Sequence, residues 1–246
     1  MNVQKILALV KMELKNLIRE PANLFLMLLF PAVLTIVFGF AFNDPELDME
    51  FSSMVPGLFA YACIFIIMTI AQSFATEREE GLLKRMNTTP MTSGEFMGSH
   101  IISNMFIAVI QVIIVYGLAV FLGFRSQGDV SGFFLAFLFM ILLSLSSVGL
   151  GLITATVSKS PGAATGISFI FILPQMFFGT FMPITSNTRI IGMFLPSFYV
   201  TDSLTSIFEG ASLTEANILI NLAIISIIGV IIVIIGIQLF KKFGNR

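Results

Sequence analysis

One stretch of this 246-residue chain concentrates side chains that can form ion pairs. Residues Thr76–Arg85 read Thr-Glu-Arg-Glu-Glu-Gly-Leu-Leu-Lys-Arg, and long hydrophobic runs lie on both sides of them. Charges of both signs between two hydrophobic runs suit contact with another protein. Because charged side chains are costly inside a bilayer, we expect this stretch outside the membrane, where another protein can reach it.

The sequence lacks the usual patterns of catalytic, metal and nucleotide sites. Cys63 is the only cysteine and His100 the only histidine, which excludes an internal disulfide and a thiolate metal cluster. There is no G-x-x-x-x-G-K-[ST] phosphate loop, no H-E-x-x-H motif and no G-x-S-x-G motif. We therefore expect no enzyme activity, no metal and no cofactor in this chain. His100 begins a hydrophobic run, so a place at the membrane interface is favoured over a proton relay.

Composition predicts a membrane protein. The residues are 57% hydrophobic and 11% charged, with a mean hydropathy of +0.98, whereas soluble domains carry roughly 25% charged residues. The hydrophobic residues form blocks long enough for a helix to cross a bilayer, which takes about 20 residues. The sequence therefore predicts an all-α integral membrane protein with six transmembrane helices, at 22–42, 55–76, 101–124, 132–157, 162–182 and 218–240.

The basic residues predict how these spans are oriented, because Lys and Arg in short loops stay in the cytoplasm. Six spans put both termini on one side of the membrane. That side then holds eleven of the thirteen Lys and Arg residues, and the other side keeps only Arg125 and Arg189. We expect a multi-pass protein of the plasma membrane with both termini in the cytoplasm.

Two further segments are predicted to be helical without crossing the membrane. Residues 1–21 form an amphipathic helix in which Lys11, Lys15 and Arg19 share a row opposite an apolar face. Such a helix lies along the membrane surface with its cations near lipid phosphates, as a simple anchor or as part of a docking surface. Residues 183–215 are apolar but interrupted, which favours a short re-entrant helix on the outer side over a surface-lying loop.

The six predicted spans contain no Asp, Glu, Lys or Arg. Secondary transporters commonly need an intramembrane carboxylate or ion site, so an ATPase-independent transporter or channel is the less favoured alternative. A non-transporting membrane scaffold that uses the charged loop to hold another protein is a second alternative.

Three stretches of the chain carry a family resemblance when they are taken in order. They are E-R-E-E-G-L-L-K-R-M-N-T-T-P at Glu77–Pro90, L-P-Q-M-F-F-G-T-F-M-P at Leu173–Pro183 and L-P-S-F-Y-V-T-D-S-L at Leu195–Leu204. The chain resembles the ABC-2 type permeases, the six-helix membrane subunits of ATP-driven exporters. The span count and the leading amphipathic helix agree, so the resemblance covers 1–246 as a single transmembrane domain. One departure is Leu82-Leu83, where the family commonly has Thr-Leu.

The resemblance implies a mechanical role for the charged loop. In this family, the loop at 77–100 would be cytoplasmic and would contain a coupling helix that fits a groove of a separate ABC ATPase, where ATP and magnesium are bound. The complete exporter would contain two ATPase copies and a second permease copy or a homologue. The residues expected to couple to the ATPase are Glu77, Arg78, Glu79, Glu80, Gly81, Leu82, Leu83 and Met86.

The resemblance also implies that the second and fifth spans face the translocation pathway. The chain has 27 Phe, 14 Met and no Trp, which favours a hydrophobic or amphiphilic cargo, drug-like or lipid-like, over a polysaccharide. The expected function is therefore that of an exporter permease, with the lipid bilayer but no nucleic acid among its partners. The residues expected to line the pathway are Phe65, Thr69, Gln72, Gln175, Phe177 and Phe178.

Overall fold

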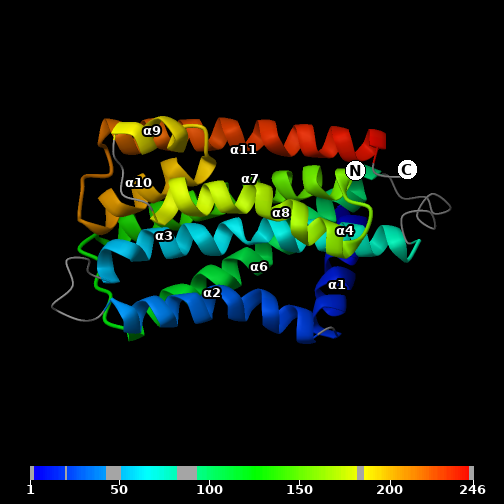
Figure 1. The fold of residues 1–246 in the computed structure, drawn as a ribbon, viewed down its shortest axis with the longest axis horizontal. Coiled ribbons are helices and arrows are strands. Elements are labelled where there is room, and N and C mark those ends of the chain that lie inside the picture. The colour runs from blue at the N-terminus through cyan, green and yellow to red at the C-terminus, as the bar shows by residue number, and fades with distance from the viewer. Residues whose placement is uncertain (1–2, 20, 43–50, 82–92, 182–185, 244–246) are drawn as a thin grey trace.

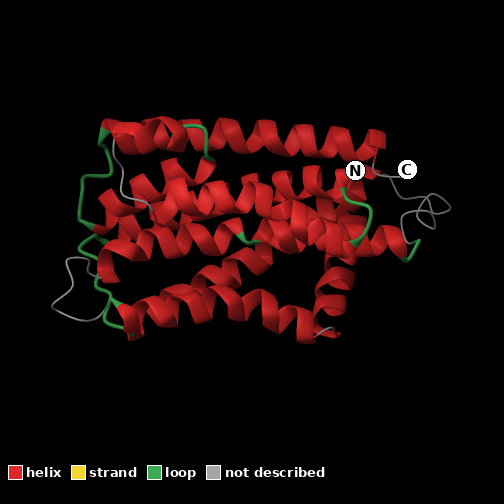
Figure 2. Ribbon diagram, viewed as in Figure 1, coloured by secondary structure: helices red, strands yellow, loops and turns green. Residues whose placement is uncertain are grey.

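The computed structural model describes residues 3–19, 21–42, 51–81, 93–181 and 186–243, and all regular structure in these ranges is helical (Figure 2). The predicted all-α fold class is thus confirmed for the described residues. The helices in chain order are α1 (Val3–Arg19), α2 (Pro21–Ala41), α3 (Phe51–Ile64), α4 (Ile66–Glu79), α6 (Ser93–Phe121), α7 (Val130–Val157), α8 (Pro161–Met176), the π-helical turn η1 (Phe177–Phe181), α9 (Ser186–Gly192), α10 (Pro196–Phe208) and α11 (Ala216–Phe243).

Five helical stretches in the described ranges are long and apolar enough to cross a membrane, and they overlap five of the six predicted spans. The remaining predicted span, 22–42, coincides with α2. The apolar part of α2 that is described is the shorter stretch Leu28–Ala41. A crossing by α2 stays a prediction, as does the surface position of α1. The five stretches are Phe51–Glu79, Gly98–Phe121, Val130–Val157, Pro161–Phe181 and Ala216–Phe240.

The helices on both sides of the charged loop are longer than the sequence predicted. α4 continues to Glu79, and α6 already begins at Ser93. The predicted loop 77–100 therefore contains helix at both of its ends. The apolar stretch Phe51–Glu79 extends past the predicted span 55–76 and includes Glu77, Arg78 and Glu79 at its end.

Helix boundaries on the other loops follow local capping chemistry. The carboxylate of Asp129 accepts a hydrogen bond from the Gly132 N–H at 2.7 Å, which caps the start of α7. This bond and the one from the Ser131 hydroxyl favour the charged carboxylate, so they lower the pKa of Asp129. α8 starts in the same way, with the Ser160 hydroxyl as cap and a proline at its first position.

α7 lies at the centre of the bundle because small residues let neighbouring helices approach it closely. Toward α11, a Cβ added at Gly149 would lie 2.8 Å from the backbone nitrogen of Val233. Toward α4, a Cβ added at Gly151 would lie 2.6 Å from the Cβ of Ile70. The backbones therefore meet directly on two sides of α7. Ser144, Ser147 and Ala155 of the same helix are also buried.

The region predicted as re-entrant, 183–215, contains two short helices in its described part, α9 and α10. Asn221 of α11 fixes α10 by donating hydrogen bonds to Asp202 at 2.8 Å and to the Ser203 hydroxyl at 3.1 Å. Phe208, at the end of α10, packs edge-on against Phe59 of α3 with ring centroids 5.7 Å apart. α10 is therefore part of the packed bundle, while its depth in a membrane stays a prediction.

The C-terminal end of α4 lies at the same end of the bundle as both ends of the described chain (Figure 1). α1 and the last turns of α11 are found where α4 finishes, and α9 and α10 are found at the opposite end (Figure 1). This arrangement brings the C-terminal ends of α4, α7 and α11 and the start of α6 to one place.

Candidate functional site

The charged stretch begins inside a helix and leaves it at a glycine. Glu77, Arg78 and Glu79 form the last turn of α4, and Glu80 caps it. Gly81 has a φ of 72°, in the left-handed region, and its N–H donates to the carbonyl of Arg78 at 3.1 Å. Glycine in this conformation is a common helix C-terminal signal, because it has no Cβ to clash. α4 therefore ends just before Gly81.

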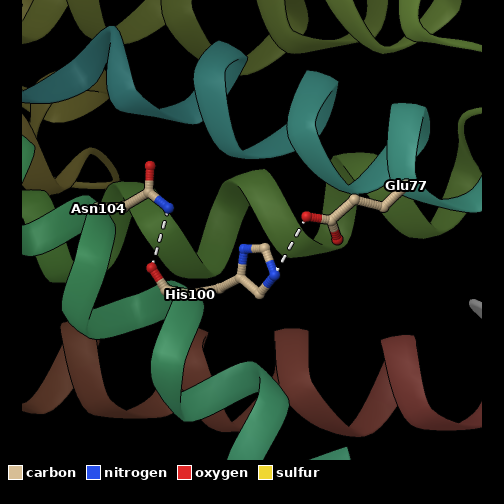
Figure 3. Close-up of polar contacts among 3 residues, drawn as sticks. All are labelled: Glu77, His100 and Asn104. Carbon is tan, nitrogen blue, oxygen red and sulfur yellow. Dashed lines mark hydrogen bonds and ion pairs between the residues drawn. The ribbon is translucent and has the colours of Figure 1, made fainter. Parts of the chain in front are cut away.

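Glu77 and His100 form an ion pair between α4 and α6 when the histidine is protonated. Nε2 of His100 lies 3.2 Å from Oε1 of Glu77, and Figure 3 shows the two side chains pointing toward one another. His100 is fully buried, while the side chain of Glu77 is 13% exposed. One turn further along α6, Asn104 donates to the carbonyl of His100 at 2.9 Å (Figure 3). His100 is therefore enclosed between helices.

Aromatic rings surround this pair on its inner side. The imidazole of His100 packs on the ring of Phe74, one turn before Glu77, with centroids 4.5 Å apart. Phe74 in turn meets Phe240 of α11 edge-on at 4.8 Å. The imidazole is thus buried against an aromatic ring and away from water, where an electrostatic interaction is stronger than it is in water.

Arg78 connects the end of α4 to the end of α7. Its guanidinium donates to the carbonyl of Ala155 at 2.6 Å and to that of Ser158 at 2.8 Å. These carbonyls belong to the last turn and the C-cap of α7, where helix backbone acceptors lack intrahelical partners and carry partial negative charge. The same guanidinium lies 5.8 Å from the centroid of the Phe240 ring, in cation–π range.

Apart from Gly81, which ends the helix, the predicted coupling residues fall into three groups. The side chains of Glu77 and Arg78 bond within the bundle, whereas Glu79 and Glu80 are exposed. Leu82, Leu83 and Met86 lie outside the described residues. Sequence reasoning did not identify the bonds of Glu77 and Arg78 to other helices. The single histidine, His100, was the one residue in the sequence that pointed to such a bond. Its position in the sequence did not indicate which acidic residue it would contact.

The predicted lining residues come from α4, α8 and their immediate neighbours, and α4 and α8 pack against each other. Gln72 joins them directly by donating to the Thr165 hydroxyl at 2.6 Å. Phe177 in η1 is 47% exposed, and Phe178 is half-buried. Their role in a pathway stays a prediction. The remaining three, which are buried in this chain, are Phe65, Thr69 and Gln175.

Comparison with known proteins agrees with this architecture. The model of the ABC-2 type transporter family matches residues 4–208. The chain is similar to a probable multidrug ABC transporter permease, YbhR, of Escherichia coli (strain K12), with 25% identity over 146 residues. It is also similar to a putative transport permease, ycf38, of Cyanophora paradoxa, with 25% identity over 265 residues.

The two relatives differ in how much of each chain is aligned. The YbhR alignment covers 58% of this chain and 39% of YbhR, so this chain spans well under two thirds of that relative. The ycf38 alignment covers 98% of this chain and 89% of ycf38. The family model itself covers most of the chain, and the five span-length helices are those of a membrane protein. This chain belongs to the ABC-2 type transporter family.

Proposed function

We propose that this chain is the permease of an ABC exporter and that ATP is hydrolysed on separate ATPase subunits. The observation that carries the proposal is the end of α4, where exposed Glu79 and Glu80 adjoin Glu77 and Arg78, which bond to other helices. A partner that contacts the exposed carboxylates would act on a turn that is already tied to α6 and α7. A docking surface that transmits force needs this combination of exposure and internal bonding.

The parts of the loop then have different roles. Glu79 and Glu80 would pair with basic groups of the ATPase, and Leu82, Leu83 and Met86 would supply apolar anchors, which give small interfaces most of their binding energy. Glu77 and Arg78 would act inside the permease. ATP and magnesium would be held by the two ATPase copies, and a second permease copy or a homologue would complete the pathway.

The proposed cargo is hydrophobic or amphiphilic, either drug-like or lipid-like. The 27 phenylalanines and the absence of tryptophan support this class of cargo, and one relative is named a probable multidrug permease. The six predicted lining residues on α4, α8 and their neighbours remain our assignment for the pathway.

An ATPase-independent transporter is the second candidate, and the Glu77–His100 pair is the observation that favours it. A carboxylate and an imidazole 3.2 Å apart inside a span-length helix pair can exchange a proton. Export that continues after removal of ATP and of the ATPase would support this candidate. A membrane scaffold would instead retain the ATPase but would export nothing.

Charge reversal at the exposed end of α4 tests the proposed ATPase contact. We expect native affinity purification in mild detergent to recover a roughly equimolar ATPase with the unaltered permease. Glu80→Lys or Leu83→Asp should lose most of that ATPase, because one reverses a contact charge and the other places a charge in an apolar anchor. Glu209→Lys is the matched control, since Glu209 is also exposed but lies at the opposite end of the bundle. Equal recovery from Glu80→Lys, Leu83→Asp and the control would reject this contact.

Orientation can be tested with single cysteines, because the native Cys63 is buried and the chain has no other. Lys159 and Glu209 are exposed near opposite ends of the bundle. We expect a membrane-impermeant maleimide to label Glu209→Cys in intact cells and Lys159→Cys only in inverted vesicles. The reverse pattern would place the charged loop outside the cell and would contradict the proposed topology.

A further inference from the structure

We propose that Glu77, Arg78 and His100 are positioning residues that join the base of the coupling loop, at the end of α4, to α6 and α7, a set called here the loop clamp. The inference rests on the proposed function, because it assumes that an ATPase acts on this loop. It concerns how motion would pass from the loop to the spans, whereas the proposed function concerns which partner binds.

The ion pair of the loop clamp joins the two helices on either side of the loop. Glu77 lies in the last turn of α4, before the segment 82–92, and His100 lies in α6, after it. Their side chains meet at 3.2 Å (Figure 3). The two ends of the loop are thereby connected to each other directly. A displacement of the loop would move the start of α6 together with the end of α4.

The guanidinium of the loop clamp extends this connection to α7. Arg78 follows Glu77 directly, and it bonds to the carbonyls of Ala155 and Ser158 at the C-terminal end of α7. α8 begins three residues after Ser158 and pairs with α4 through Gln72 and Thr165. Movement of the α4 end would therefore reach α8, which carries a predicted lining residue.

The chemistry of the loop clamp suits a positioning role better than a purely stabilising one. A buried ion pair contributes little net stability compared with two well-packed apolar side chains, because both groups must lose water. It does require one relative geometry of the two helices, as does a guanidinium bonded to two carbonyls at once. Phe74 and Phe240 restrict this geometry further by packing against His100 and Arg78.

The test uses the full permease with its ATPase in liposomes. It measures recovered ATPase, ATP hydrolysis and exported cargo, for which a fluorescent hydrophobic dye is the probe. Glu77→Gln keeps the shape of the side chain but removes its charge. We expect it to retain the ATPase and to hydrolyse ATP, while dye exported per ATP falls about fivefold to tenfold, as for the loss of one coupled pair. Glu209→Gln is the matched control, because it removes an exposed carboxylate at the opposite end of the bundle, away from the proposed ATPase contact.

Rescue and a second variant make the result specific. The exchange Glu77→His with His100→Glu should restore part of the export per ATP that either single change loses. Arg78→Lys keeps the positive charge but cannot bond to both α7 carbonyls as guanidinium does, so it should also lower export per ATP. This variant keeps the test decisive if the Glu77→Gln permease does not assemble. Unchanged export per ATP in both Glu77→Gln and Arg78→Lys would overturn the loop clamp. Failure of the unaltered permease to recover any ATPase would instead overturn the proposed function.

Discussion

Replacing Gly81 with proline is expected to abolish ATP-driven export while the permease still inserts into the membrane. Proline fixes φ near −65°, whereas Gly81 has a φ of 72° where the chain leaves α4. The variant must therefore redirect the segment that follows Glu80 and displace the proposed contact with the ATPase. Dye export and ATP hydrolysis in liposomes measure the effect, and cysteine labelling at Glu209 measures insertion.

A graded series at Gly81 separates backbone conformation from side-chain bulk. No described atom lies within 4 Å of a Cβ added at Gly81, so none of the described residues obstructs a larger side chain there. Asparagine adopts the left-handed region readily, so Gly81→Asn should retain most of the export. This conformation costs alanine about 1–2 kcal/mol, so Gly81→Ala should have an intermediate effect. Proline should be the most severe. Normal export by the proline variant would show that the path of the chain at this turn is unimportant for coupling.

Replacing Gly151 with alanine is expected to lower the stability of the bundle by about 1–3 kcal/mol, the usual cost of overpacking. The added Cβ would lie 2.6 Å from the Cβ of Ile70 and 2.9 Å from the carbonyl oxygen of Ile67. Neither atom is the flexible end of a side chain, so α4 and α7 must separate. Because Arg78 joins the same two helices further along, export per ATP should also fall. Thermal unfolding in detergent measures the change in stability.

Gly117→Ala provides the matched control for Gly151→Ala. Gly117 is also inside a span-length helix, but no described atom lies within 4 Å of a Cβ added there. The same substitution should leave the melting temperature unchanged or raise it, because alanine favours a helix over glycine by about 0.5–1 kcal/mol. Equal melting temperatures for the two variants would contradict the close approach of α4 and α7 at Gly151.

The spans were predictable because they depend on composition along a local window. A run of about 20 apolar residues becomes a membrane helix whatever its neighbours are, and five of the six predictions coincide with span-length helices. The ends of these helices were less predictable. The charge of Glu77 and Arg78 indicated a loop, but partners on α6 and α7 allow both residues to remain in helix.

The close packing around α7 was only partly visible in the sequence. The small residues Ser144, Ser147, Gly151 and Ala155 recur at a spacing that lets another helix come close, and the structure shows that Gly151 meets α4. The spacing did not indicate which helix would lie there. Nor did it indicate the contact of Gly149 with α11 on another side of α7.

The sequence by itself determined the membrane class, the approximate spans and the family, because hydropathy and short motifs are properties of consecutive residues. Only the tertiary structure decided what each charge near the end of α4 does. Successive residues of a helix point about 100° apart, so Glu77 and Arg78 are buried or exposed according to which helices lie beside them. His100, Ala155 and Ser158 are 23 to about 80 residues away from their partners in the sequence. The residues next to Glu77 and Arg78 therefore do not specify which distant segments will contact them.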